Sequence, residues 1–95
     1  MAYGRGVVSV VFAKAFRRHV ECPDGAYPGA TVRAVLDAYC ADHPQVRPYV
    51  LDDAGAVRKH VAIFVGDDLI ADRTTLSDAV APDGRVHVFQ ALSGG

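Results

Sequence analysis

The last two residues of the chain, Gly94 and Gly95, are those whose type and position favour the most distinctive chemistry. A terminal α-carboxylate becomes an acyl donor once it is activated, for example as a mixed anhydride with AMP. Glycine has no Cβ atom, so this pair can closely approach the catalytic groups of another protein. Four extended residues, 92–95, span roughly 13–14 Å, enough to enter a narrow channel. We therefore predict a tail that is the substrate of another protein's active site.

The other residues that carry chemistry lack the spacing of a catalytic or metal site. Cys22 and Cys40 form no C-x-x-C motif, and we interpret them as small buried thiols rather than as a disulfide. The aspartate pairs at 52–53 and 67–68 stand in turn contexts, where aspartate hydrogen-bonds the backbone. We interpret the four histidines as surface or strand-edge residues rather than as metal ligands; they are His19, His43, His60 and His87. We predict no metal, no catalytic thiol and no bound cofactor.

Length and charge exclude several classes of protein. A chain of 95 residues makes one domain and is too short for two independent cores. Ten Lys+Arg against eleven Asp+Glu give a net charge of −1, which provides neither a basic footprint for nucleic acid nor a polybasic membrane anchor. There is no apolar run long enough for a membrane span, and the first six residues lack the pattern of a signal peptide. We expect a cytoplasmic protein with neither nucleic acid nor membrane as partner.

The strong strands are predicted from β-branched and aromatic composition, over residues 7–13, 60–65 and 85–91. In the first of them, period-two alternation places Val8, Val10 and Phe12 on one face. In the last, Val86 and Val88 share a face, and the residues between them point the other way. Each of these two strands therefore has one face suited to a core.

The one clear helix is predicted over residues 32–42. Its apolar residues follow the i, i+3, i+4, i+7, i+8 pattern of an amphipathic helix and are Val32, Val35, Leu36, Tyr39 and Cys40. Thr31 is the expected N-cap, and Pro44 disfavours helical geometry at the residue before it. Because so short a helix is marginal in water by itself, it needs a sheet to pack on.

Shorter elements are predicted for the remaining segments. A second extended piece is expected at 19–23, joined to the first strand by a hairpin connection, and residues 46–52 are either a short strand or an irregular crossing. Residues 75–78 are expected to form a single helical turn that buries Leu76. Turns are expected at 23–25, 52–55, 66–68 and 82–84. The third of these turns leads into a short extended piece at 69–70.

This element order predicts an α+β fold of two layers, because a single helix is available to cover the sheet. If the first and last strong strands pair side by side, the geometry is a ubiquitin-like β-grasp, with a mixed sheet of four to five strands and one main helix packed on one face. An SH3-like layout lacks the helix, and a ferredoxin-like layout needs two. The domain is expected over residues 1–91, followed by a flexible tail at 92–95.

Several motifs resemble the second half of ubiquitin in order and spacing: I-F-V-G-D-D-L at 63–69, R-T-T-L-S-D at 73–78, V-H-V at 86–88 and the Gly-Gly end. Over nearly the whole chain the sequence resembles the ubiquitin-like sulfur carriers of the MoaD/ThiS family, which includes the small subunit of molybdopterin synthase. Its longer members share an Asp-rich turn (52–55), a V-x-I-x-V strand (61–65) and an Asp-Gly pair (83–84) before the last strand. The sequence departs from that pattern at Gly66, where many relatives have asparagine, and at 91–93, which replace a proline-containing run.

The resemblance implies a carrier protein rather than an enzyme. In this family an E1-like adenylyltransferase of the MoeB/ThiF type uses ATP to adenylate the terminal glycine. A sulfur donor then converts it to a thiocarboxylate, which hands sulfur to a biosynthetic acceptor enzyme that makes molybdopterin, thiazole, cysteine or a thio-metabolite. The resemblance implies that the carbonyl carbon of Gly95 is the reacting atom and that Gly94 keeps the approach to it clear.

A docking surface beside the tail is a further hypothesis. If Val86 and Val88 face the helix, His87 and Phe89 lie on the other side of the sheet. Whether Phe64 joins them there, or is core with Ile63 exposed instead, is left open by the sequence. The hypothesis is that Phe89, together with Phe64, Leu92 and His87, docks the activating enzyme or the acceptor.

Two other functions compete with the carrier role. The chain can be a ubiquitin-like modifier that forms isopeptide bonds on target lysines. In that case only Lys14 and Lys59 are available to accept a further copy, which disfavours polymeric chains. Alternatively, it can be a non-covalent β-grasp interaction module whose Gly-Gly end is accidental.

Overall fold

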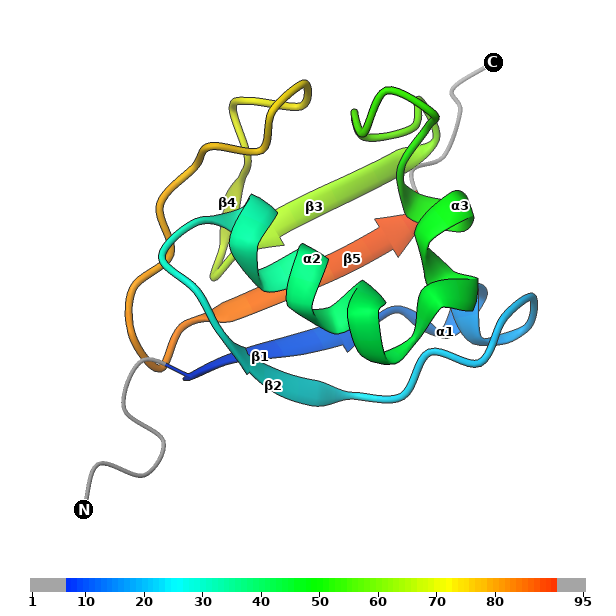
Figure 1. Cartoon of the computed structure of the whole chain (residues 1–95), viewed down its shortest axis with the longest axis horizontal. Coiled ribbons are helices and arrows are strands. Elements are labelled where there is room, and N and C mark those ends of the chain that lie inside the picture. The colour runs from blue at the N-terminus through cyan, green and yellow to red at the C-terminus, as the bar shows by residue number, and fades with distance from the viewer. Residues whose placement is uncertain (1–6, 91–95) are drawn as a thin grey trace.

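The computed structural model describes residues 7–90. It contains a five-stranded mixed sheet with one long helix on one face (Figure 1). The strands are β1 (Val7–Phe12), β2 (Gly25–Pro28), β3 (Val61–Val65), β4 (Asp68–Leu69) and β5 (Arg85–Gln90). The helices are α1 (Lys14–Arg17), α2 (Val32–Asp42), the 3-10 turn η1 (Pro44–Val46) and α3 (Arg47–Val50). The sheet order is β2-β1-β5-β3-β4. The predicted α+β class and ubiquitin-like β-grasp arrangement are confirmed.

The centre of the sheet is the parallel pair of β1 and β5. Val10 lies beside Val86 in this pair, and both side chains are fully buried. On the outer sides, β2 pairs antiparallel with β1, and β3 pairs antiparallel with β5. The prediction that the first and last strong strands pair side by side is therefore correct. The chain's last described strand is held in the middle of the sheet rather than at an edge.

Helix α2 has the predicted bounds, and local signals account for both of its ends. The Thr31 side chain accepts a hydrogen bond from the Ala34 N–H (3.2 Å), as an N-cap does. At the other end His43 leaves helical geometry, with φ −130° and ψ 67°, directly before Pro44. In Figure 1 the helix crosses in front of the sheet, so its buried stripe faces β1, β5 and β3.

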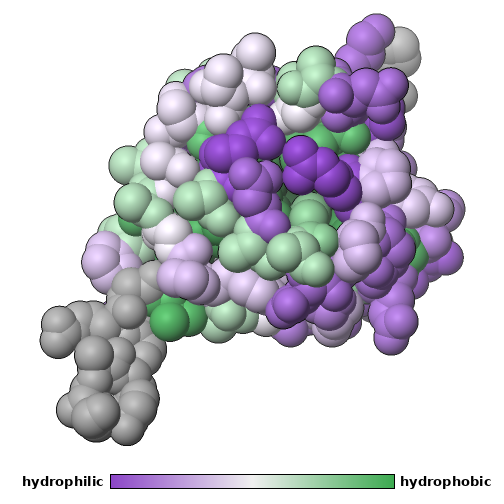
Figure 2. Space-filling view, in the orientation of Figure 1, coloured by the Kyte–Doolittle hydropathy of each residue, from purple (hydrophilic) through white to green (hydrophobic). Residues whose placement is uncertain are grey.

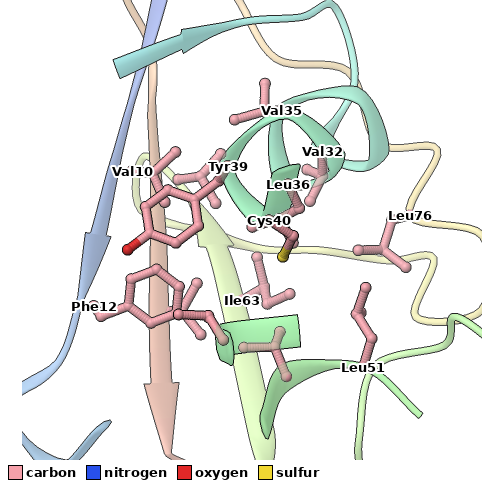
Figure 3. Packing of buried hydrophobic residues seen from close by; sticks show 14 of the residues in the cluster. Val10, Phe12, Val32, Val35, Leu36, Tyr39, Cys40, Leu51, Ile63 and Leu76 are labelled. Carbon is pink, nitrogen blue, oxygen red and sulfur yellow. The ribbon is translucent and has the colours of Figure 1, made fainter. Parts of the chain in front are cut away.

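The core lies between α2 and the sheet (Figure 3). Leu36 and Ile63 are at most 1% exposed, and the ring of Phe12 packs 5.1 Å from that of Tyr39. The Tyr39 hydroxyl donates to the Pro23 carbonyl oxygen (2.7 Å), so the polar end of this buried ring is satisfied. Burial raises the pKa of Tyr39 well above its ordinary value, which keeps the phenol neutral.

The predicted strand at 19–23 is wrong. The chain instead forms helix α1 directly after β1, and β2 follows only at Gly25–Pro28. The spacing of Phe16 and Val20 explains the difference, because these apolar residues lie four apart and the Val20 N–H donates to the Phe16 carbonyl oxygen (3.1 Å). Phe16 is 4% exposed, so helical geometry here places an aromatic side chain in the core.

Both alternatives for residues 46–52, a strand or an irregular crossing, are also wrong. Residues 46–50 are helical, in η1 followed by α3, and Leu51 then forms an isolated antiparallel bridge with Val57. Val46 and Val50 are buried and lie four residues apart, which is a helical spacing. Pro44 and Pro48 occupy the first turns of these two elements, where proline is tolerated because no intrahelical N–H is needed.

The loop before β5 buries Leu76 as expected, but not in a helical turn over 75–78. The turn instead spans residues 72–76, where the Leu76 N–H donates to the Asp72 carbonyl oxygen (3.1 Å), and Leu76 itself has a φ of +55°. The Asp72 carboxylate holds this conformation. It accepts hydrogen bonds from the backbone N–H groups of Thr74, Thr75 and Ser77, and from the hydroxyls of the last two of these residues. These bonds lower the pKa of Asp72 far below its usual range.

We predict that Leu36→Ala lowers the free energy of unfolding by about 2–5 kcal/mol, because it leaves a cavity between α2 and the sheet. Urea denaturation followed by far-UV circular dichroism measures the change. The matched control is Leu69→Ala at a leucine that is 56% exposed, where the change should stay below about 0.5 kcal/mol. Equal losses of unfolding free energy in the two variants would contradict the placement of the core between α2 and the sheet.

We also predict that Asp72→Ala lowers the melting temperature at neutral pH. Because the pKa of Asp72 is lowered in the folded protein, its stabilising effect is present above the usual aspartate value of 3.8 and is lost as the pH falls below it. The difference in melting temperature between wild type and variant should therefore shrink under acid. Asp53→Ala, at an exposed turn position, is the control. A difference in melting temperature that stays constant with pH would contradict a stabilising role of the ionised Asp72 carboxylate.

Candidate functional site

The sheet face away from α2 carries the residues that the docking hypothesis names. In β5, Val86 and Val88 are fully buried under the helix, so His87 and Phe89 point to the opposite face. In β3, Ile63 is fully buried, and this places Phe64 on the outer face as well. The question that the sequence left open is therefore settled, since Phe64 is a surface residue and Ile63 is core.

Strand register brings these side chains together. Phe64 lies directly opposite His87, and Ala62 lies opposite Phe89. The Phe64 and Phe89 rings meet edge to face with centroids 5.5 Å apart, and the His87 ring is 5.2 Å from that of Phe89. We call these four residues the outer-face patch. With Gly66 and Asp67 they line a shallow hollow of about 600 Å³.

The outer-face patch is partly open to solvent, in contrast to the buried face of the sheet under α2. The Phe89 side chain is 39% exposed, although its ring is entirely apolar. Leu69 extends the apolar surface, because it lies on β4 opposite Phe64 and is 56% exposed. Sequence reasoning missed Leu69, although the two-residue turn Gly66–Asp67 determines that pairing. Figure 2, by contrast, shows the helix-covered side, where hydrophilic residues gather over the centre and right of the view.

The outer-face patch lies near the point where β5 ends. Phe89 is next to Gln90, the last residue that the structure describes. Three of the residues predicted to act at the site, Leu92, Gly94 and Gly95, lie outside the described residues. The structure thus places Phe64, His87 and Phe89 together, and the predicted role of the terminal glycines stays a prediction.

The cysteines and turn aspartates have the structural roles that the sequence indicated. Cys22 and Cys40 are both buried and unpaired, and desolvation raises the pKa of each thiol, which disfavours the nucleophilic thiolate. The Asp52 carboxylate accepts hydrogen bonds from the Ala54 and Ala56 N–H groups (2.9 and 3.0 Å). Between residues 7 and 90, no three His, Cys, Asp or Glu side chains gather as metal ligands would. That same stretch contains no helix with the length and apolarity to cross a membrane.

The central parallel pair, the covering helix and the open outer face define the ubiquitin-like β-grasp fold. The small archaeal modifier protein 1 (SAMP1) of Haloferax volcanii superimposes with a TM-score of 0.77 at 22% identity, over 95% of this chain and 100% of that one. A chain of the Amycolatopsis orientalis BexX/CysO complex gives 0.76 at 19% identity, over 93% and 99% of the two chains. Urm1 of Trypanosoma brucei gives 0.66 at 14%, over 96% and 97%. No protein-family model and no curated protein matches the sequence.

We predict that the Phe64 and Phe89 rings are energetically coupled. A double-mutant cycle with Phe64→Ala, Phe89→Ala and the double variant should give a coupling of about 0.5–1.5 kcal/mol, as measured edge-to-face pairs do. Urea denaturation of the four proteins provides the values. Tyr49→Ala replaces Phe89→Ala in the control cycle, because Tyr49 is an exposed aromatic residue on α3. A coupling of zero between the two phenylalanines would contradict the packed patch.

Proposed function

We propose that this chain is a sulfur carrier protein that acts through the terminal carboxylate of Gly95. The observation that carries the proposal is that β5, the central strand of a ubiquitin-like β-grasp, is followed in the sequence by a Gly-Gly pair only a few residues later. The sequence resemblance to the MoaD/ThiS family gives independent support. In this proposal the chain has no catalytic residues and binds no cofactor, and the partner enzyme uses the ATP.

The proposed reaction proceeds in two displacements. A carboxylate oxygen of Gly95 attacks the α-phosphorus of ATP in an E1-like adenylyltransferase, so that an acyl-adenylate forms and pyrophosphate leaves. The sulfur of a donor such as hydrosulfide then attacks the carbonyl carbon. The bond from that carbon to the AMP oxygen breaks, AMP leaves with the electron pair, and the donor's proton passes to solvent. The thiocarboxylate then transfers its sulfur to a biosynthetic acceptor enzyme.

The outer-face patch is the proposed docking surface for these enzymes. Phe89 is exposed and lies next to the last residue of β5, and the half-buried Phe64 ring packs against it; large aromatic residues are the usual energetic anchors of protein interfaces. The proposal assigns a docking role to Leu92 as well, a residue outside the part of the chain that the structure describes. The BexX/CysO complex supports a protein partner, because it contains a neighbour of the same fold bound in a protein complex.

A ubiquitin-like modifier is the second candidate function. The name of the Haloferax neighbour, a modifier protein, is the observation that favours it. A modifier shares the adenylation step, and the two functions diverge afterwards. The nucleophile is a sulfur donor in a carrier, whereas it is a target lysine amine in a modifier.

Intact-mass spectrometry tests the carrier function. We predict that incubation with an E1-like adenylyltransferase, ATP and hydrosulfide raises the mass by the difference between one sulfur and one oxygen atom. Tandem fragmentation should place the change on Gly95. A variant that lacks Gly94 and Gly95 is the negative control. An unchanged mass with an adenylyltransferase that forms the AMP adduct of this chain would argue against the carrier, and lysine-linked adducts in cells would support the modifier.

Phe89→Arg tests the docking part of the proposal. We predict that the KM of the adenylyltransferase for this variant rises about tenfold or more, because a charged side chain replaces an aromatic anchor. Tyr49→Arg, at an exposed aromatic residue on α3 outside the patch, should leave the KM unchanged. Circular dichroism confirms that both variants fold. Unchanged kinetics for Phe89→Arg would remove the patch from the interface.

A further inference from the structure

The outer face of the sheet carries a second hollow, which is polar. It has a volume of about 250 Å³, and its lining includes Asp67, Asp83 and Arg85 together with Ser9 and His87. Ser9 alternates with the buried residues of β1, so the hollow opens on the face away from α2. Asp67 and His87 also line the apolar hollow of the outer-face patch, and the two hollows therefore adjoin. We call the polar one the acidic groove.

Negative charge dominates the acidic groove. Asp67 and Asp83 are exposed, and neither forms an ion pair with another residue between 7 and 90. The same holds for Asp68, which follows Asp67 at the start of β4. Among the described lining residues, Arg85 alone carries a permanent positive charge. Three carboxylates thus stand against one guanidinium, so this end of the outer face attracts a cationic side chain.

The N-terminal segment 1–6 joins the fold at this groove. The Asp83 N–H donates to the carbonyl oxygen of Val7 (3.1 Å), the first residue of β1. Figure 1 shows the same proximity, because β1 begins beside the loop that leads into β5. Residues 1–6 lie outside the part of the chain that the structure describes, and their sequence is M-A-Y-G-R-G. The segment supplies one aromatic residue, Tyr3, and one cationic side chain, Arg5.

The spacing of Tyr3 and Arg5 matches the spacing of the two hollows. Ser9, two residues after the start of β1, lines the acidic groove. Val11, four residues after that start, lies beside His87, which borders both hollows. Arg5 and Tyr3 stand two and four residues before the same point, and four extended residues span about 13 Å in either direction. A segment that folds back over the outer face therefore brings Arg5 to the groove and Tyr3 to the apolar hollow.

We propose that residues 1–6 fold back at Gly6 and cover the outer-face patch as an intramolecular strap. Arg5 pairs with the carboxylates of the acidic groove, and the Tyr3 ring packs on the two phenylalanines of the patch. Gly6 permits the tight reversal because it has no Cβ atom. The strap and a partner enzyme then compete for one surface. That competition rests on the proposed function, whereas the strap itself does not.

The N-terminal segment complements this surface better than the C-terminal one does. Residues 91–95, A-L-S-G-G, contain no cationic side chain and follow the opposite end of β5. The six residues of β5 separate that end from the acidic groove by about 20 Å. An uncharged segment leaves the carboxylates of the groove without a partner. Arg5 provides that partner within two residues of β1.

NMR spectroscopy of the full chain tests the strap without any activation reaction. We predict nuclear Overhauser contacts between the Tyr3 ring and the rings of Phe64 and Phe89. Arg5→Glu reverses the charge that holds the strap, so these contacts should weaken about threefold or more, and the amide signals of both hollows should shift. Arg5→Lys should preserve the contacts. High salt should weaken them in the wild-type chain, because it screens the ion pair.

Arg18→Glu is the matched control. It makes the same change in net charge at an exposed residue just after α1, which follows the far end of β1, and it should leave the Tyr3 contacts within error. Equal losses in Arg18→Glu and Arg5→Glu would assign the effect to net charge and overturn the strap. The absence of any Tyr3 contact in the wild-type chain would overturn it as well. Contacts that grow with protein concentration would contradict an intramolecular strap and assign the segment to a second copy.

The adenylation reaction tests the competition. If the strap covers the patch about two thirds of the time, its release raises the competent fraction about threefold. We therefore predict that the KM of the adenylyltransferase for Tyr3→Ala is about threefold below that for the wild type. An unchanged KM beside confirmed Tyr3 contacts would reject the competition. Because the NMR experiment needs no adenylation, Tyr3 contacts together with an unchanged mass under ATP and hydrosulfide would reject the carrier function and leave the strap in place.

Discussion

The parallel pairing of β1 with β5 is the constraint on which the rest of the molecule depends. It brings the first and last described strands together at the centre of the sheet, so that β3 and β2 can be added only on the outside. Val10 and Val86 meet there beneath α2, fully buried. Because the central strand lies between two neighbours, its backbone donors and acceptors are satisfied on both sides. Strand β5 therefore provides a rigid base from which the following residues continue.

The same strand supplies both the core and the candidate site. Val86 and Val88 pack under α2, and the residues that alternate with them, His87 and Phe89, form the outer-face patch with β3. A shift of one residue in the pairing would exchange these two sets between core and solvent. The burial of the valines thus fixes the position of the surface aromatics. The stability of the core and the position of the outer-face patch therefore depend on a single register.

Sequence reasoning succeeded where the determining signals are local. The bounds of α2 follow from its apolar spacing, from Thr31 and from Pro44, all of which act within a few residues. It failed at β2, because the residues G-A-Y-P have little strand propensity and are extended only through pairing with β1. It also missed the helical segment after Pro44, where two prolines obscured the four-residue spacing of buried valines.

The candidate site was only partly predictable for the same reason. The segment V-A-I-F-V is apolar at every position, so alternation alone cannot decide which of its faces is buried. The pairing of Phe64 with His87 across β3 and β5 decides it, and such a contact between distant segments is not encoded locally.

The central position of β5 also governs how the polypeptide acquires its structure during translation. Until residues 85–90 have left the ribosome, the β1–β2 and β3–β4 pairs have no common neighbour, and β1 lacks its parallel partner. A nascent chain that ends before β5 therefore cannot complete the sheet, because β5 joins the two pairs of strands and is the last of the five to be synthesised. Closure of the sheet therefore requires that all five described strands have been synthesised.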